Sequence, residues 1–281
     1  KDFGSVFSVN PPSYAYGNVY IQTGNHGSDT YLRAYAAATG EAIFQTPHAA
    51  QWERYYAPTI FEGRVYVDGG TYGGMYSFDA FAGTQNWFVG LPQYDEWTPA
   101  VDATMAYAYV GEYSPGLYAI NRMTGILEYM IPDPDFDWNG WSMDLAPVLG
   151  SLHDVLAIHD GRLLNFDTQT RSIRWQLARN FTGQPSVARG FIYAIDDGTL
   201  VALDEASGQQ AWSWQPPEGW LGGSIVVTGT HLFATTADNV YAVELISHDV
   251  AWSYPAAGQL ALGEETLYIA SSTGMLTAIS M

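Results

Sequence analysis

Hydrophobic and polar residues alternate in short runs along the chain, and glycine, proline, asparagine or aspartate separates the runs. Segments such as 17-20 (GNVY) and 63-66 (GRVY) place a tight turn directly before a β-branched and an aromatic residue. This pattern is typical of short β-strands joined by tight turns. No apolar run approaches the roughly 18 residues that a membrane-spanning segment needs. The alternation therefore predicts an all-β chain without a membrane span.

One nine-residue phrase recurs along the chain: apolar, any residue, alanine, apolar, Asp or Asn, two residues, Thr or Ser, glycine. A large aromatic residue follows four positions later, as in LYAINRMTG (117-125) with Tyr129 and LVALDEASG (200-208) with Trp212. The seven copies start 36 to 46 residues apart, at Leu32, Met75, Leu117, Leu163, Leu200, Val240 and Leu276. This period is typical of propeller blades of four strands each.

A second marker precedes most copies of the phrase. A proline stands eight residues before an apolar or aromatic residue in the first five copies, at Pro12, Pro58, Pro99, Pro147 and Pro185. We interpret the segment after the proline as strand A, the Gly-x-Val-Tyr type of segment as strand B, the phrase as strand C and the closing aromatic as strand D. Residues 1-281 are thus predicted to form one domain, a seven-bladed β-propeller of four-stranded antiparallel blades.

The two ends of the chain suggest how the ring closes. The last copy of the phrase stops at Met281, whereas the segment GSVFSV around Phe7 has no strands of its own blade before it. We expect residues 3-9 to pair as strand D of blade seven, which would remove an exposed sheet edge.

The phrases LYAINRMTGxxxY, LVALDEASGxxxW and MYSFDAFAGxxxW resemble the repeats of the PQQ-like, or quinoprotein-type, propeller superfamily, and the resemblance to its non-enzymatic branch covers nearly the whole chain. The resemblance implies that the alanine and glycine of one phrase dock against a strand-D tryptophan (Trp87, Trp175, Trp212, Trp252) between blades. Arg171 and His248 replace the glycine, so the contact is in doubt there. We do not expect PQQ, because the PQQ-dependent dehydrogenases have eight larger blades and often paired cysteines, whereas this chain has no cysteine.

Loop lengths differ between the two ends of the predicted blades. The A-B and C-D turns have nearly constant lengths, whereas the B-C and D-A connections vary and are longest in blades one to four. We call these two ends the turn face and the loop face. Function is expected on the loop face, because binding residues concentrate on loops held by a rigid scaffold.

Aromatic and charged residues gather in these long connections. Rings beside carboxylates can stack on sugars, and tyrosine and tryptophan also anchor protein interfaces. Alternatively, long loops fold onto one another through their own aromatic side chains. The ligand-binding candidates are Trp52, Arg54, Tyr55, Tyr56, Tyr72, Tyr94, Trp97, Trp138 and Trp141.

The longest connection contains a D-x-D-x-N-G run that starts at Asp135. Alternating carboxylate and amide oxygens before a glycine turn can hold a calcium ion. The run departs from the EF-hand pattern, since Ala146 stands at position 12, and a solvated acidic turn is the alternative. The candidate calcium ligands are Asp135, Asp137, Asn139, Trp141 and Asp144.

Charge and cysteine content remove several classes of function. The chain carries 29 acidic and 10 basic residues, a net charge of −19, so it repels nucleic acid and anionic lipid. Without cysteine there are no disulfides, thiolate metal sites or cysteine nucleophiles. The start KDFGSVFSVN lacks the apolar region of a signal peptide, so we expect a mature form or a domain excised from a larger protein.

These observations predict a non-catalytic recognition or scaffold module, extracellular, on the cell surface or periplasmic, and monomeric as a domain. Its partner would be a glycan or a protein on the loop face of blades one to four. Two alternatives remain open. One is a polysaccharide lyase with a base such as His26, His48 or a tyrosine and with Arg54 facing a uronate. The other is a protein-assembly scaffold, as in the related outer-membrane assembly propellers.

Overall fold

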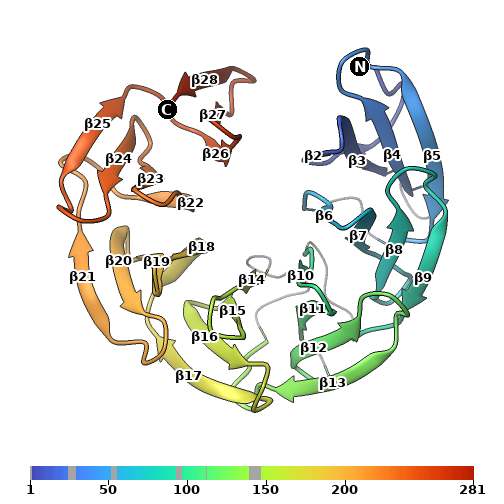
Figure 1. Cartoon of the computed structure of the whole chain (residues 1–281), viewed down its shortest axis with the longest axis horizontal. Coiled ribbons are helices and arrows are strands. Elements are labelled where there is room, and N and C mark those ends of the chain that lie inside the picture. Colours follow the sequence, from blue (N-terminus) through green and yellow to red (C-terminus); the bar gives the residue numbers. More distant parts are fainter. Residues whose placement is uncertain (1, 25–29, 52–55, 93–96, 112, 139–146) are drawn as a thin grey trace. The chain divides into compact units, whose positions relative to one another are not determined.

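The structure of the protein is a computed structural model, which describes residues 2-24, 30-51, 56-92, 97-111, 113-138 and 147-281. In these residues the secondary structure consists of 28 strands in seven antiparallel sheets and contains no helix (Figure 1). No helix that could span a membrane is therefore found in this part of the chain. The chain divides into two compact units, residues 1-147 and residues 148-281, which are described separately.

The first unit contains blades one to three. Its strands are β1 (Ser8–Val9), β2 (Ser13–Ala15), β3 (Asn18–Gly24), β4 (Thr30–Ala36) and β5 (Ala42–His48), then β6 (Thr59–Phe61), β7 (Arg64–Asp68), β8 (Met75–Asp79) and β9 (Gln85–Val89), then β10 (Ala100–Val101), β11 (Met105–Val110), β12 (Gly116–Asn121) and β13 (Leu127–Pro132). Each sheet follows the chain order, from strand A to the outer strand D.

The second unit contains blades four to seven. Its strands are β14 (Val148–Leu149), β15 (Asp154–His159), β16 (Arg162–Asp167), β17 (Ser172–Ala178), β18 (Phe181–Ala188), β19 (Phe191–Asp196), β20 (Thr199–Asp204), β21 (Gln210–Trp214), β22 (Gly222–Val227), β23 (His231–Thr235), β24 (Val240–Glu244), β25 (Val250–Tyr254), β26 (Gln259–Leu262), β27 (Thr266–Ala270) and β28 (Leu276–Ser280). The last sheet has three strands, β26-β27-β28, within the described residues. The predicted fold class, a seven-bladed β-propeller of four-stranded antiparallel blades, is confirmed.

The N-terminal strand lies on the first blade, so the assignment of residues 3-9 to blade seven is wrong for Ser8 and Val9. Ser8 pairs with Gly24 and Val9 pairs with Thr23 of β3, on the same edge to which β2 binds. Strand A of blade one is thus split around Pro11 and Pro12, because proline has no N–H for the ladder. Strand β18 of blade five shows the same interruption, a register shift between Thr182 and Ser186 around Pro185.

Short hairpin turns produce the constant spacing on the turn face. The pairs Tyr16-Gly17, Glu62-Gly63 and Arg189-Gly190 connect strands A and B, and both residues of each pair have positive φ. Two-residue turns of this kind match the twist of the paired strands. Each turn therefore holds its strands in a fixed register.

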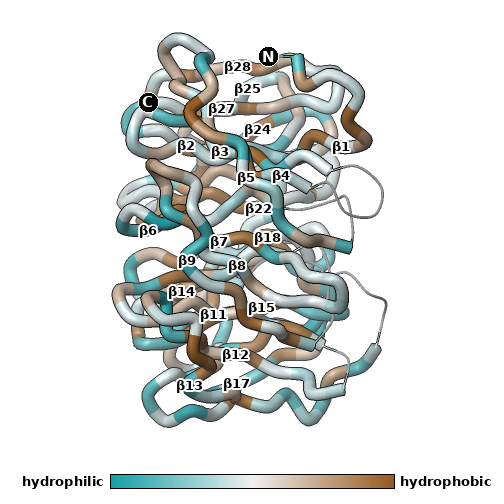
Figure 2. Tube along the Cα trace, turned by 90° about the vertical axis from the view of Figure 1, so that its right-hand side faces the viewer, coloured by the Kyte–Doolittle hydropathy of each residue, from teal (hydrophilic) through white to brown (hydrophobic). Residues whose placement is uncertain are grey.

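The core lies between neighbouring blades and is built by strands B and C. Residues of β7 and β8, such as Val65, Val67 and Phe78, pack with Tyr20 and Leu32 of the preceding blade. Brown and pale positions follow one another along the strands in Figure 2, as half-buried strands require. Burial of this apolar area drives the packing of successive blades.

The docking contact implied by the repeats is present within each unit. The indole N–H of Trp87 donates to the carbonyl oxygen of Arg122 in the next blade, at 3.0 Å, and its ring covers Gly125. Trp175 makes the same contact with Glu205 at 3.0 Å and covers Gly208. In blade six, where glycine is missing, the imidazole of His248 stacks on Trp212 at 4.1 Å. The substitution therefore changes the contact to ring stacking and does not abolish it.

Candidate functional site

The long connections on the loop face contain exposed aromatic side chains in blades two and three. Tyr72, between β7 and β8, is 73% exposed, and Trp138, after β13, is also exposed. Tyr56 is half-buried. The other predicted ligand residues, except Trp97, lie outside the described residues: Trp52, Arg54, Tyr55, Tyr94 and Trp141. The structure therefore describes only part of the predicted surface.

Trp97 is a core residue, which corrects its assignment to ligand binding. Its side chain is 1% exposed, and its backbone N–H lies 3.5 Å from the carboxylate of Asp68 in blade two. A ring without a free face cannot stack on a ligand. Its place in a loop of acidic and aromatic residues suggested exposure, because loop composition does not record which side chain packs inward.

Two of the exposed aromatic residues that were not predicted candidates stand in B-C or D-A connections. Tyr113, between β11 and β12, is 90% exposed. Trp220 is exposed in the connection between β21 and β22, where it lies against Gly198. Tyr113 stands in one of the long connections and could have been selected from the sequence. Trp220 could not, because its connection is short and blade five showed no elaborated loop.

The D-x-D-x-N-G run is only partly described. Asp135 and Asp137 are exposed, whereas Asn139, Trp141 and Asp144 lie outside the described residues. Asp133, just before the run, is buried and accepts hydrogen bonds from the hydroxyl of Tyr109 at 2.7 Å and the N–H of Asp135 at 3.2 Å. Asp133 therefore holds the start of the loop. No group of three metal-ligating side chains occurs within the residues that are described.

His48 is a buried residue at the end of β5. Its ring lies 3.4 Å from the amide of Gln22 and packs edge-on against Tyr76 and Phe78. Burial lowers the pKa of His48 to about 4, although a backbone hydrogen bond at Thr46 opposes the shift. The imidazole is therefore neutral and cannot reach a substrate at the surface. His26, the other histidine considered as a lyase base, lies outside the described residues.

We expect the stability of the protein to fall in mild acid because of His48. Its pKa in the folded state lies below the unfolded value of 6.5, so the unfolded state binds more protons as the pH falls from 6.5 towards 4. This group should lower the free energy of unfolding by about 1.5 kcal/mol between pH 6.5 and pH 5. Urea unfolding of wild type and His48→Gln measures this loss. An equal pH dependence in both proteins would contradict it.

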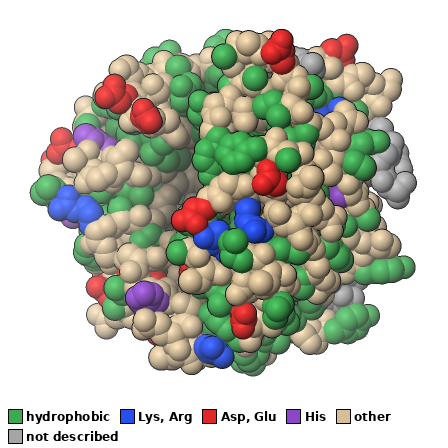
Figure 3. Space-filling view, turned by 45° about the vertical axis from the view of Figure 1, so that its right-hand side comes forward, with side chains coloured by type: hydrophobic (Ala, Val, Ile, Leu, Met, Phe, Trp, Pro, Cys, Tyr) green, Lys and Arg blue, Asp and Glu red, His purple; other side chains and the backbone are tan. Residues whose placement is uncertain are grey.

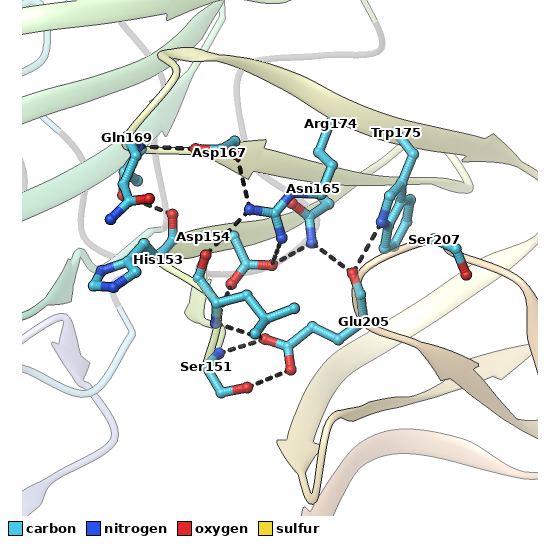
Figure 4. A network of polar contacts seen from close by, with 12 residues as sticks. Ser151, His153, Asp154, Asn165, Asp167, Gln169, Arg174, Trp175, Glu205 and Ser207 are labelled. Carbon is cyan, nitrogen blue, oxygen red and sulfur yellow. Dashed lines mark hydrogen bonds and ion pairs between the residues drawn. The ribbon is translucent and has the colours of Figure 1, made fainter.

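A buried polar network connects blades four and five (Figure 4). Glu205, the sixth residue of the blade-five phrase, accepts hydrogen bonds from the N–H and the hydroxyl of Ser151 in the A-B turn of blade four. Asp154 accepts from the amide of Asn165 and, at 3.1 Å, from the N–H of Leu152. Arg174 lies 3.6 Å from Asp154. The network therefore ties the turn of one blade to the phrase of the next.

Two carboxyl groups share this buried site. Burial raises the pKa of Asp154, the hydrogen bond from Asn165 opposes the rise, and the negative charge of Glu205 adds to it. A Cβ at Gly150 would lie 2.1 Å from Asp154 and 2.7 Å from Glu205, so any other residue there would displace these carboxylates. We interpret the network as a structural clamp between blades. Sequence reasoning missed it because Asp154 and Glu205 are far apart along the chain.

Two substitutions of Glu205 should distinguish the contribution of its hydrogen bonds to stability from the contribution of its charge. Glu205→Ala removes a fully buried side chain together with its hydrogen bonds from Ser151 and should cost about 2 kcal/mol of unfolding free energy. Glu205→Gln keeps an acceptor and removes the repulsion of Asp154, so its stability at pH 7 should equal or exceed that of wild type. Because the raised pKa of Asp154 penalises its ionised form, the wild type should approach Glu205→Gln in stability as the pH falls. Denaturant unfolding of the wild type and the two variants at pH 7 and pH 5 measures these differences in unfolding free energy. Equal losses of unfolding free energy in Glu205→Ala and Glu205→Gln would contradict the repulsion between Glu205 and Asp154.

The fold and its repeats define the protein as a propeller of the PQQ-like repeat type. The chain belongs to the family described as outer membrane protein assembly factor BamB, whose sequence model matches residues 4-214 and 196-281. A comparison with curated proteins finds no significant match.

Solved structures with the same fold include proteins of quite different kinds. BamB from Moraxella catarrhalis superposes with a TM-score of 0.75 at 20% identity, over 98% of this chain and 84% of that protein. The quinohemoprotein alcohol dehydrogenase ADHIIG from Pseudomonas putida HK5 has a TM-score of 0.68 at 12% identity, over 96% and 64% of the two chains. The computationally designed protein Ika8 has a TM-score of 0.64 at 10% identity, over 99% and 98%. At these identities the likeness concerns the fold.

Proposed function

We propose that the protein is a non-catalytic scaffold of the periplasm that takes part in outer-membrane protein assembly by binding a protein partner. The match of the family model to nearly the whole chain carries this proposal. A rigid propeller that presents loops is suited to hold other proteins, and fold alone does not decide between binding and catalysis.

The loop face of blades two and three supplies the contact surface in this proposal. Tyr72 and Tyr113 are both exposed. Hydrophobic and acidic side chains also lie beside one another on the side of the molecule that Figure 3 shows. Exposed tyrosines are frequent anchors of protein interfaces, because the ring buries apolar area and the hydroxyl makes a hydrogen bond. Neither ring is required by the core of its own blade.

The experiment tests the assembly role in the source organism. A strain that lacks the gene is complemented with wild type, with a Tyr72→Ser/Tyr113→Ser double variant, or with Ile43→Ser as an exposed control on β5. We expect less folded outer-membrane β-barrel protein, measured by heat-modifiable migration, in the double variant alone. Full assembly in the strain without the gene would overturn the proposal, and full assembly in the double variant would exclude this surface.

A glycan is the second candidate partner. The exposed ring of Tyr113 favours it, because a flat ring with a free face can stack on a sugar. A glycan array with the purified protein distinguishes the two partners. Binding that is lost in Tyr113→Ser would support the glycan.

Calcium binding by the loop of Asp135 and Asp137 stays a prediction. An ion there would neutralise part of an acidic segment and order the connection, so calcium should raise the melting temperature. Asp137→Ala should remove the gain. If millimolar calcium changes neither the melting curve nor the heat in titration calorimetry, the run is a solvated acidic turn.

A further inference from the structure

Large apolar side chains are exposed on the turn face of blades two and three, at one position of the repeated phrase. Its seventh residue is Phe81 in blade two and Met123 in blade three, which are 57% and 53% exposed. Tyr16, in the A-B turn of blade one, is exposed beside Phe81, with the ring centroids 5.2 Å apart. We name Tyr16, Phe81 and Met123 the turn-face cluster.

The other copies of the phrase show that the fold does not need an apolar residue at this position. Position seven is Ala206 in blade five and Gln169 in blade four, and both are exposed. The turn is closed by the same contact in each case: Asp79 accepts the N–H of Phe81 at 2.9 Å, as Asp167 accepts that of Gln169 at 2.9 Å. The exposed Phe81 and Met123 are therefore not explained by the local structure.

Polar contacts connect the members of the cluster across three blades. The hydroxyl of Tyr16 accepts the N–H of Gly63 at 2.9 Å, and Phe81 lies next to Gly63. Glu62, the neighbour of Gly63, forms an ion pair with Arg122, whose Nε also donates to the carbonyl oxygen of Ala103 at 2.7 Å. Met123 follows Arg122 in the chain. These contacts fix the turns that hold the three side chains in neighbouring blades.

Carboxylates lie around the cluster, and the two arginines beside it, Arg64 and Arg122, are not exposed: Arg64, which follows Gly63 and pairs with Asp79, is half-buried. Glu62 is exposed, whereas Arg122 is buried and is paired with Glu62. Burial tends to raise the pKa of Asp102 in the A-B turn of blade three, but hydrogen bonds from Met105, Thr104 and Tyr107 outweigh it, so the pKa lies below its usual value. Three carboxylates, those of Glu62, Asp79 and Asp102, therefore outnumber the two arginines around the apolar rings, in a chain of net charge −19.

We propose that the turn-face cluster is a docking site for a protein segment that presents basic side chains around an apolar one. Arginine can lie over the exposed rings of Tyr16 and Phe81 while the apolar side chain covers Met123. The surrounding carboxylates attract the basic segment and disfavour acidic ones. This surface is separate from the loop face and goes beyond the proposed function.

The test uses fluorescent synthetic peptides and the whole protein at physiological salt. The probe is an eight-residue peptide that alternates leucine and arginine; one control replaces leucine by glycine, and another replaces arginine by glutamate. The protein variants are Phe81→Gln/Met123→Gln, because glutamine occupies this position in blade four, and Ile246→Gln as a control. Ile246 occupies the same position in blade six and is 76% exposed.

The leucine-arginine peptide should bind, and the Phe81→Gln/Met123→Gln variant should weaken its binding about tenfold, as loss of apolar anchors does. Ile246→Gln and Tyr72→Ser/Tyr113→Ser should leave the affinity unchanged, which separates this site from the loop face. In wild type, the peptide should slow hydrogen exchange in residues 60-63, 80-83 and 122-125 but not in 245-248. The proposal is overturned if the glycine-arginine peptide binds equally well, if the glutamine variant retains the affinity, or if these amides are not protected.

Discussion

Trp97→Ala is expected to cost about 3 to 5 kcal/mol of unfolding free energy, because it removes a large ring that is fully buried and leaves a cavity. The residue precedes β10, and its backbone N–H lies near the carboxylate of Asp68 in blade two. Guanidinium unfolding followed by far-ultraviolet circular dichroism measures the loss.

Trp138→Ala is the matched control, because Trp138 is an exposed tryptophan of the same unit. Its change in unfolding free energy should stay within about 0.5 kcal/mol. A Trp97→Ala protein as stable as the wild type would show that the ring is not part of the core.

Gly125→Ala should destabilise the protein by about 2 to 4 kcal/mol through the contact between blades two and three. Gly125 has φ +73°, and a Cβ there would lie 2.7 Å from the ring of Trp87. The left-handed backbone alone costs alanine about 1 kcal/mol, and the forced shift of a packed indole adds about 1 to 3 kcal/mol.

Gly190→Ala distinguishes the cost of the left-handed backbone from the cost of displacing the indole. Gly190 has φ +78° in an A-B turn, and a Cβ there would meet nothing within 4 Å. This variant should lose only about 1 kcal/mol. Thermal unfolding by calorimetry compares the two, and equal losses would mean that the indole moves aside without cost.

His248 shows why the contact survives without glycine in one blade. The imidazole lies nearly parallel to Trp212, with 21° between the ring planes, although the residue has φ +63°. Stacked rings gain dispersion and electrostatic energy that can offset a strained backbone. The sequence indicated that histidine replaces the glycine but not that its imidazole would stack on Trp212.

The repeat by itself determined the blade number, the strand order and the turns. Regular spacing of the phrase, of the prolines and of pairs such as Glu62-Gly63 reflects local hydrogen bonding and backbone conformation, which a short segment encodes. The same spacing also predicted which connections share a face. Successive antiparallel strands run in opposite directions, so the A-B and C-D turns lie at one end of a blade and the B-C and D-A connections lie at the other. The repeated phrases also showed the resemblance to the family.

Only the tertiary structure decided which side chains are buried and which residues meet. Trp97 packs inward, Ser8 and Val9 pair with β3, and Glu205 reaches Ser151 of another blade. Each of these depends on partners that are distant in the chain, so no local period records them. The sequence does not distinguish a loop tryptophan or an acidic residue that faces water from one that faces another blade. The burial of such a residue is set by the neighbours that pack against it in the folded protein.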